Sequence, residues 1–190
     1  MEITLERLVN DFARALEEMD QRGLSHKQFQ PGIGPFGEAE AVRGALEALK
    51  RNKPERYREA AIKRQPDLLI PDQWQLEFKI LRPFGDNGRE AEHWSQNLLH
   101  PYAGNTSSIG DALKLLHSAG PERKGIIVFG YEHAEPRISL EPCIQGFELL
   151  ATGLFGFEFA ATASATVDGL IHPVHQVLKV FGWELSTSRA

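Results

Sequence analysis

Two carboxylic acids and a turn between them form the part of this chain whose spacing indicates chemistry. A Pro-Asp-Gln turn centred on Asp72 separates two short apolar runs over residues 66–82, which predicts a strand hairpin. Asp67 and Glu77 are each five residues from Asp72, so an antiparallel hairpin places them opposite each other, with Cβ atoms about 4.5–5.5 Å apart. Two carboxylates at that separation repel, and a divalent cation bound to oxygens of both would offset the repulsion.

Lys79 lies two residues after Glu77 and therefore on the same face of the strand. The opposite face is expected to be apolar, because its positions alternate with those of the charged residues: Trp74, Leu76, Phe78 and Ile80. An acid within an apolar strand costs several kcal/mol if it is buried without a partner. The alternative is a half-exposed strand face on which Glu77 and Lys79 form a surface pair.

Pro66-Asp67 and Glu77-Phe78-Lys79 resemble the signature of the PD-(D/E)XK nuclease superfamily, which has the restriction-endonuclease-like fold. The resemblance covers roughly residues 36–131. It implies that Asp67, Glu77 and the carbonyl of Phe78 bind Mg²⁺, with Mn²⁺ as a substitute. It also implies that Lys79 orients or activates the attacking water and stabilises charge on the phosphate.

Many members of this superfamily add an acid from the helix before the hairpin, and Glu38 and Glu40 are the choices here. Glu38 lies four residues before Val42, on the stripe expected to pack against the sheet, whereas Glu40 points elsewhere. A carboxylate near a helix start is also favoured by the helix dipole, so a structural role for Glu38 is the alternative.

The net charge of −5 argues against a nucleic-acid partner, but the charge is unevenly distributed. Residues 43–64 hold eight basic and three acidic side chains, a net charge of +5, which leaves −10 for the rest of the chain. This stretch directly precedes the hairpin, where a nuclease would contact phosphates; a solvated helix face is the alternative. The nucleic-acid-binding candidates are Lys50, Arg51, Lys53, Arg56, Arg58, Lys63 and Arg64.

Several other polar residues are weaker candidates. His93 and Gln96 share a face by a spacing of three and are candidate accessory groups lining the cleft, with a solvated helix as the alternative. His172 and His175 flank Pro173 and suggest a transition-metal pair, but without a third ligand nearby in sequence we interpret them as incidental.

The expected elements are those of an α/β fold with a central mixed sheet flanked by helices. Helices are predicted over 3–22, 38–51, 89–99, from Ser107 or Ser108 to 116, and over 141–153, with a helical turn within 55–63. Strands are predicted in the hairpin and over 124–131, 155–171 and 176–185. The order helix-strand-strand-helix-strand within residues 38–131 is that of the superfamily core, with the helix and buried strand after the hairpin returning to the same sheet.

Composition supports an ordinary globular protein. With 190 residues and 42% hydrophobic content, we expect a single nuclease-like domain over 1–190, with 1–30 as an N-terminal helical extension. The start lacks a secretory signal, and the apolar stretch 149–167 contains Glu158 and reads as a helix end plus a strand, so we expect no membrane segment and a cytoplasmic location.

The sequence thus predicts a metal-dependent endonuclease that hydrolyses DNA phosphodiester bonds. A homodimer would let two sites address both strands, with the charge-poor stretch 146–183 as its contact. One alternative is a catalytically inactive member of the same fold that serves as a nucleic-acid or protein binding module. The other is an unrelated structural or partner-binding protein in which Glu77 and Lys79 are only a surface pair.

Overall fold

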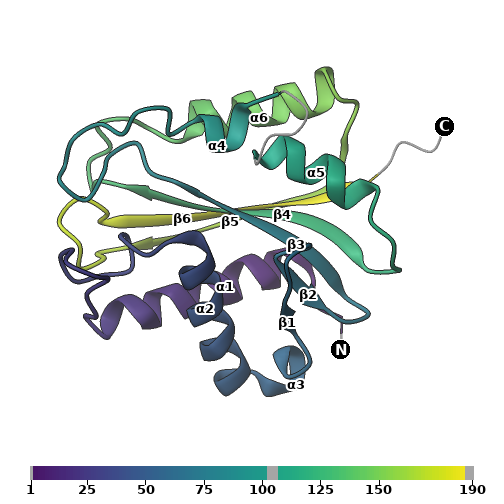
Figure 1. Ribbon diagram of the computed structural model, residues 1–190, viewed down its shortest axis with the longest axis horizontal. Helices are drawn as coiled ribbons and strands as arrows, with labels where there is room; N and C mark the ends of the chain where they lie inside the picture. Colours follow the sequence, from purple (N-terminus) through teal and green to yellow (C-terminus); the bar gives the residue numbers. More distant parts are fainter. Residues whose placement is uncertain (1, 102–106, 187–190) are drawn as a thin grey trace.

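A six-stranded mixed β-sheet lies between two layers of helices in the computed structural model, which describes residues 2–101 and 107–186 (Figure 1). The strands, in the spatial order β1-β2-β3-β4-β6-β5, are β1 (Ala61–Ile62), β2 (Leu68–Ile70), β3 (Trp74–Leu81), β4 (Arg123–Glu132), β5 (Glu158–Asp168) and β6 (Val177–Ser186). The helices are α1 (Leu5–Gln21), α2 (Glu38–Asn52), α3 (Pro54–Tyr57), α4 (Gln96–Leu99), α5 (Ser108–Leu116) and α6 (Glu141–Gly153). The predicted fold class, α/β with a central mixed sheet flanked by helices, is confirmed.

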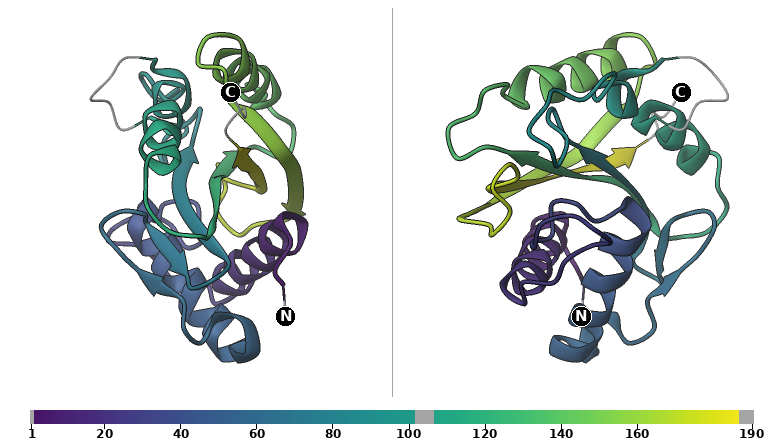
Figure 2. Two further views of the ribbon diagram at one scale, coloured as in Figure 1. Left: turned by 90° about the vertical axis from the view of Figure 1, so that its right-hand side faces the viewer. Right: turned by 60° about the vertical axis from the view of Figure 1, so that its left-hand side comes forward.

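Each face of the sheet packs on its own set of helices (Figures 1 and 2). On the side of α1, α2 and α3, the ring of Phe12 lies 5.1 Å from that of Phe78 and 6.0 Å from that of Phe129. On the side of α4, α5 and α6, the ring of Phe147 meets Trp183 edge to face at 4.8 Å. Burial of these aromatic rings on both faces, a large favourable contribution to folding, fixes the three layers.

The hairpin forms about Asp72 as the turn chemistry predicts. Leu68 pairs with Leu76 in an antiparallel ladder, and the same register continued by one residue places Asp67 opposite Glu77. Asp72 has a φ of 59°, a left-handed conformation that Asp tolerates in turns. The predicted register of the two acids therefore agrees with the observed pairing.

β3 and β4 run parallel, and the chain between them passes over one face of the sheet through α4 and α5. A parallel connection of this kind needs a crossover, which the helix-plus-strand pattern predicts. Ser107 is the N-cap of α5, where its hydroxyl oxygen accepts from the backbone N–H of Gly110 at 3.2 Å.

Two element predictions need correction. The helix expected over 89–99 is limited to α4, because the residues before it form turns and His93 has a left-handed φ of 58°. The helical turn expected within 55–63 is α3, after which the chain becomes extended and adds β1 to the edge of the sheet. In both segments polar residues interrupt the apolar positions, so no continuous apolar stripe favours a longer helix.

The stretch 1–30, expected to be a helical extension, is part of the core. Leu8, Phe12 and Leu16 of α1 are fully buried, and the helix packs on α2, β5 and β6. An extension would leave this apolar stripe in water, which is why the helix docks on the sheet. Among the helices of the described residues, none combines the length and apolar character needed to cross a membrane.

Candidate metal centre at the β2–β3 fork

The candidate site lies where β2 and β3 separate. The ladder between them ends at Leu68 and Leu76, so in the described chain the edge of β3 beyond this point has no strand partner on that side. The backbone N–H of Phe78 at this edge donates to Oδ2 of Asp67 at 2.9 Å. The carboxylate thus takes the place of the next ladder bond, and it is held against β3 beside Glu77.

Glu77 and Lys79 are buried, with 6% and 9% of their surface exposed. They lie on the face of β3 that packs against α5, and Trp74, Leu76 and Phe78 occupy the opposite face at 0% exposure. The predicted alternation is therefore present, but the interpretation of Glu77 and Lys79 as a surface pair is wrong. Ionisable groups this deep require compensation by charge or hydrogen bonds.

The ammonium of Lys79 is surrounded by oxygen atoms. Its Nζ lies 2.7 Å from Oδ2 of Asp111, 3.7 Å from Oε1 of Glu38 and 2.9 Å from the carbonyl oxygen of Phe78. Burial works against the charge of Lys79, but Glu38, Asp111 and Asp67 outweigh it and raise its pKa. Lys79 is therefore a permanent cation at neutral pH, and it contacts the same carbonyl that the resemblance assigns to the metal.

Glu77 has the most perturbed acidity of the group. Burial and the adjacent Asp67, through its charge and a side-chain hydrogen bond, raise the pKa of Glu77 to about 9, with a smaller contribution from Asp111. Lys79 acts in the opposite direction but does not compensate. Without a further cation Glu77 holds a proton at neutral pH, which means that the cluster contains more acid than its own bases neutralise.

Glu38 reaches the cluster from α2, as its position on the buried stripe predicts. It is the first residue of the helix, and the backbone N–H of Ile80 on the open edge of β3 donates to its carboxylate. Burial, followed by the charges of Asp67 and Asp111, raises the pKa of Glu38, and Lys79 opposes that shift. Glu40 is exposed, so the choice between the two acids is settled by geometry.

Asp111 is a member of the cluster that the sequence analysis missed. It is 4% exposed and accepts from two ammonium groups, that of Lys79 through Oδ2 and that of Lys114 through Oδ1, each at 2.7 Å. Asp111 lies four residues before Leu115 on the buried stripe of α5. The spacing argument that selected Glu38 would therefore have found it.

The seven basic candidates separate into two groups. Lys53 and Arg56 pair with the buried Asp11, and Arg51 pairs with Glu18, so these three bind the helices together. Among the described residues no ion pair involves the other four, which are Lys50, Arg58, Lys63 and Arg64. The backbone N–H of Lys63 donates to the carbonyl of Asp67 at 3.1 Å. Lys63 and Arg64 are exposed and lead directly into the acid cluster.

His93 and Gln96 contact each other, with 3.0 Å between Nδ1 of His93 and Nε2 of Gln96. Both are exposed, and none of the hydrogen bonds described here joins them to the acids. The shared helix face expected for them is not formed, because His93 lies in a turn before α4, and the structure does not bring the two residues together with Asp67 and Glu77.

Comparisons with protein-family models, curated proteins and solved structures found no match to this chain. We therefore infer the function of the chain from the chemistry of the cluster. The carboxyl groups of Glu38 and Asp111 contact the buried ammonium of Lys79, and those of Asp67 and Glu77 lie close enough to interact with its charge. All these donors are hard oxygen atoms, the ligand type that Mg²⁺, Mn²⁺ and Ca²⁺ prefer.

Proposed function

We propose that this chain is a Mg²⁺-dependent endonuclease of the restriction-endonuclease-like fold that hydrolyses DNA phosphodiester bonds. The observation that carries the proposal is the set of Asp67, Glu77 and Lys79 on a forked hairpin, in which Glu77 and Lys79 are buried and the half-buried Asp67 is held against β3 by the backbone N–H of Phe78. Strongly perturbed carboxyls beside a lysine are a feature of catalytic centres. A structural ion pair involving Lys79 would need only one acid, not the four carboxyl groups of Glu38, Asp67, Glu77 and Asp111.

The residues present fit a divalent cation. Asp67 and Glu77 would hold it, with Mn²⁺ able to replace Mg²⁺, and the excess acid identified by the pKa of Glu77 is what a dication would neutralise. When bound, the ion would supply a hydroxide at neutral pH and stabilise negative charge on the phosphate. The Phe78 carbonyl accepts a hydrogen bond from Lys79 at 2.9 Å. For this carbonyl to bind the ion, the Lys79 ammonium would have to release it and turn toward the substrate.

Lys79 acts as a cation rather than as a base in this proposal. Its pKa is raised by the surrounding acids, so it keeps its proton at neutral pH and cannot accept one from water. Its N–H groups can instead donate to a phosphate oxygen and to the attacking water, and thereby stabilise the charge that develops in the transition state. Asp111 and Glu38 hold the ammonium at the open edge.

DNA backbone contacts are proposed for the basic side chains that lack acidic partners in the described chain, namely Lys50, Arg58, Lys63 and Arg64. Lys63 and Arg64 precede Asp67 directly, so a phosphate near the acids would lie within the field of both. Contacts of this kind provide affinity and position but do not read base sequence.

Cleavage of supercoiled plasmid and single-stranded DNA tests the proposal, in Mg²⁺, Mn²⁺ or EDTA. We expect metal-dependent cutting that falls by about a hundredfold or more in Lys79→Ala, because a donor to the developing charge is lost. Asp111→Asn should lower the rate less, since it frees the ammonium without removing it. Lys27→Ala, at an exposed lysine outside the cluster, is the matched control and should cut at the native rate.

The melting temperature distinguishes a metal-binding nuclease from a protein that does not bind metal at this site. Mg²⁺ or Mn²⁺ should raise it in the native chain and not in an Asp67→Asn, Glu77→Gln double variant. Folded protein that neither cuts nor is stabilised by these ions would overturn the proposal. DNA retention without cutting or metal stabilisation would favour the alternative of an inactive binding module.

A further inference from the structure

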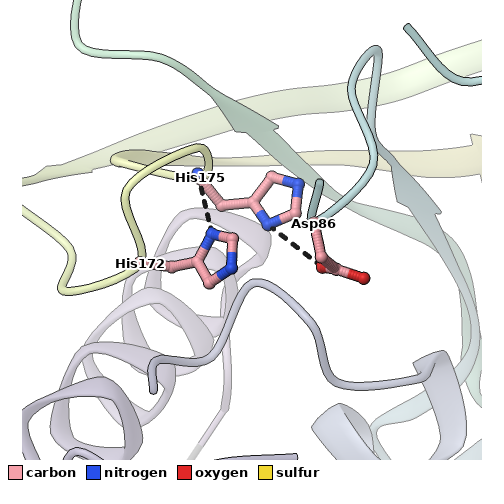
Figure 3. A group of neighbouring side chains, drawn as sticks. All are labelled: Asp86, His172 and His175. Carbon is pink, nitrogen blue, oxygen red and sulfur yellow. Dashed lines mark hydrogen bonds and ion pairs between the residues drawn. The ribbon is translucent and has the colours of Figure 1, made fainter. Parts of the chain in front are cut away.

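A second group of metal-ligand side chains lies outside the acid cluster. His172 and His175, from the connection between β5 and β6, meet Asp86 from the loop after β3 (Figure 3). One ligand atom of each residue lies within 4.8 Å of the other two. The interpretation of the histidines as incidental assumed that no third ligand was near, and the fold supplies that ligand from a distant part of the sequence.

The three converging atoms are buried without hydrogen bonds. Nε2 of His172, Nδ1 of His175 and Oδ1 of Asp86 have no partner within the described part of the chain, and the two histidines are 0% and 1% exposed. Buried polar atoms left unsatisfied cost about 1–3 kcal/mol each. Three such atoms directed at one point indicate a missing partner shared by all of them.

The hydrogen bond of His175 determines which of its nitrogens is free. Its Nε2 lies 2.9 Å from the carbonyl oxygen of Phe84, which can only accept, so Nε2 carries the proton and Nδ1 holds a lone pair. That lone pair faces Oδ1 of Asp86 at 3.7 Å, too far for a hydrogen bond.

The ring of His172 stacks on that of His175, with centroids 4.7 Å apart and planes at 19°. Its Nδ1 faces the backbone N–H groups of Val174 and His175, each at 3.3 Å, and these long contacts orient Nε2 toward Asp86 and His175 (Figure 3). A ring that accepts at Nδ1 carries its proton on Nε2. Metal binding at Nε2 therefore requires this proton to move to Nδ1 or to leave the ring.

We propose that Asp86, His172 and His175 bind one transition-metal ion, with Zn²⁺ as the best fit. Two imidazole nitrogens and one carboxylate oxygen are a typical ligand set for such an ion, and a fourth position remains for water. The carbonyl of Phe84 on Nε2 of His175 is the kind of outer partner that orients a metal-binding histidine. Asp86 also lines an open surface hollow with Gln28–Gln30, so its side chain is reached from solvent.

The packing around Asp86, His172 and His175 indicates a structural role for the proposed ion. A Cβ on Gly34 would lie 2.4 Å from the His175 ring, so the loop before α2 packs directly on this group. The ion would therefore join two loops at one end of the sheet, on which the loop that leads to Glu38 packs.

The test starts from chain stripped of metal with a chelator and titrated with Zn²⁺ in excess Mg²⁺, which occupies oxygen-only sites. We expect one Zn²⁺ per chain, a higher melting temperature, and ¹⁵N shifts at Nε2 of His172 and Nδ1 of His175. Affinity should fall by more than about tenfold in Asp86→Asn and His172→Gln, since a ligand is lost. It should be unchanged in Asp67→Asn, the matched carboxylate control at the β2–β3 fork.

The ¹⁵N shifts of the histidine rings are measured on the native chain, so they test the proposal even where a variant fails to fold. Absence of Zn²⁺ binding by the native chain, or binding that leaves both ring nitrogens unshifted, would overturn the proposal. Equal affinity in Asp86→Asn and the native chain would do the same. Because Asp67→Asn removes the fork acid and leaves the histidines intact, loss of nuclease activity and loss of Zn²⁺ binding are distinguishable.

Discussion

At the scale of single residues, Glu77 is the acid of the proposed metal centre whose pKa is most strongly raised. Glu77 lies beside Asp67 on a buried strand face, and burial together with the charge of Asp67 raises its pKa to about 9. A dication that binds there has to release the proton of Glu77. Metal affinity should therefore rise with pH, by up to about tenfold per unit while Glu77 titrates.

The raised pKa of Glu77 also predicts how the free energy of unfolding of the metal-free protein depends on pH. Its pKa is about 9 in the folded chain against 4.5 for the free side chain, so the folded state binds more protons between these values. This contribution is fully present below about pH 4.5 and is lost as pH rises through about 9, at up to about 1.4 kcal/mol per pH unit. Urea unfolding in EDTA at several pH values measures this slope.

Glu77→Gln is the control for that slope. Glutamine keeps the shape and does not titrate, so the variant should show a smaller decline of the unfolding free energy with rising pH. An identical pH profile in the two proteins would show that Glu77 titrates normally. Asp72→Asn, in the turn of the same hairpin, should keep the native slope.

At the scale of elements, the basic stretch owes part of its composition to helix packing. Asp11 of α1 is 4% exposed, and it accepts from Lys53, from Arg56 at 3.1 Å and from the hydroxyl of Tyr57 at 2.8 Å. One buried carboxylate thus joins α1 to the α2–α3 connection. Removing it would leave both cations and a buried hydroxyl without their acceptor.

We expect Asp11→Ala to lower the free energy of unfolding by about 1–3 kcal/mol, because the buried donors lose their acceptor. Glu18→Ala is the matched control, since Glu18 pairs with Arg22 and Arg51 at the surface and such pairs contribute less than about 1 kcal/mol. Chemical denaturation of both variants measures the difference. Equal losses would contradict a special role for Asp11.

At the scale of the whole molecule, the far edge of the sheet is the best surface for a second copy. β5 is an edge strand of eleven residues, and the neighbouring α6 leaves Leu149 73% exposed, with Leu154 just after it 63% exposed. Long unpaired edges and exposed apolar side chains favour association. We propose a homodimer through this face, within the charge-poor stretch 146–183.

Light scattering should give a mass twice that of the 21.3 kDa chain, and Leu149→Lys should return it to that of the monomer. Leu24→Lys is the control, because Leu24 is 56% exposed at a different place. A native mass of 21.3 kDa would remove the dimer proposal. All four acids of the proposed metal centre come from one chain, so we expect monomeric protein to bind metal as well.

Local periodicity was enough to predict most elements and the core of the fork. The period of two along β3 and the turn at Asp72 place Asp67, Glu77 and Lys79 together, and the helical period places Glu38 on the buried side of α2. These relations depend only on spacing within one hairpin or one helix. They hold wherever the hairpin and the helix are packed.

Only the tertiary structure decided how deep these groups lie and which distant residues join them. Burial of Glu77, the approach of Asp111, the commitment of Lys53 and Arg56 to Asp11, and the meeting of Asp86 with the two histidines all depend on which elements pack side by side. Those neighbours are chosen by the burial of two apolar layers over the whole chain. Spacing within one segment carries no information about that choice.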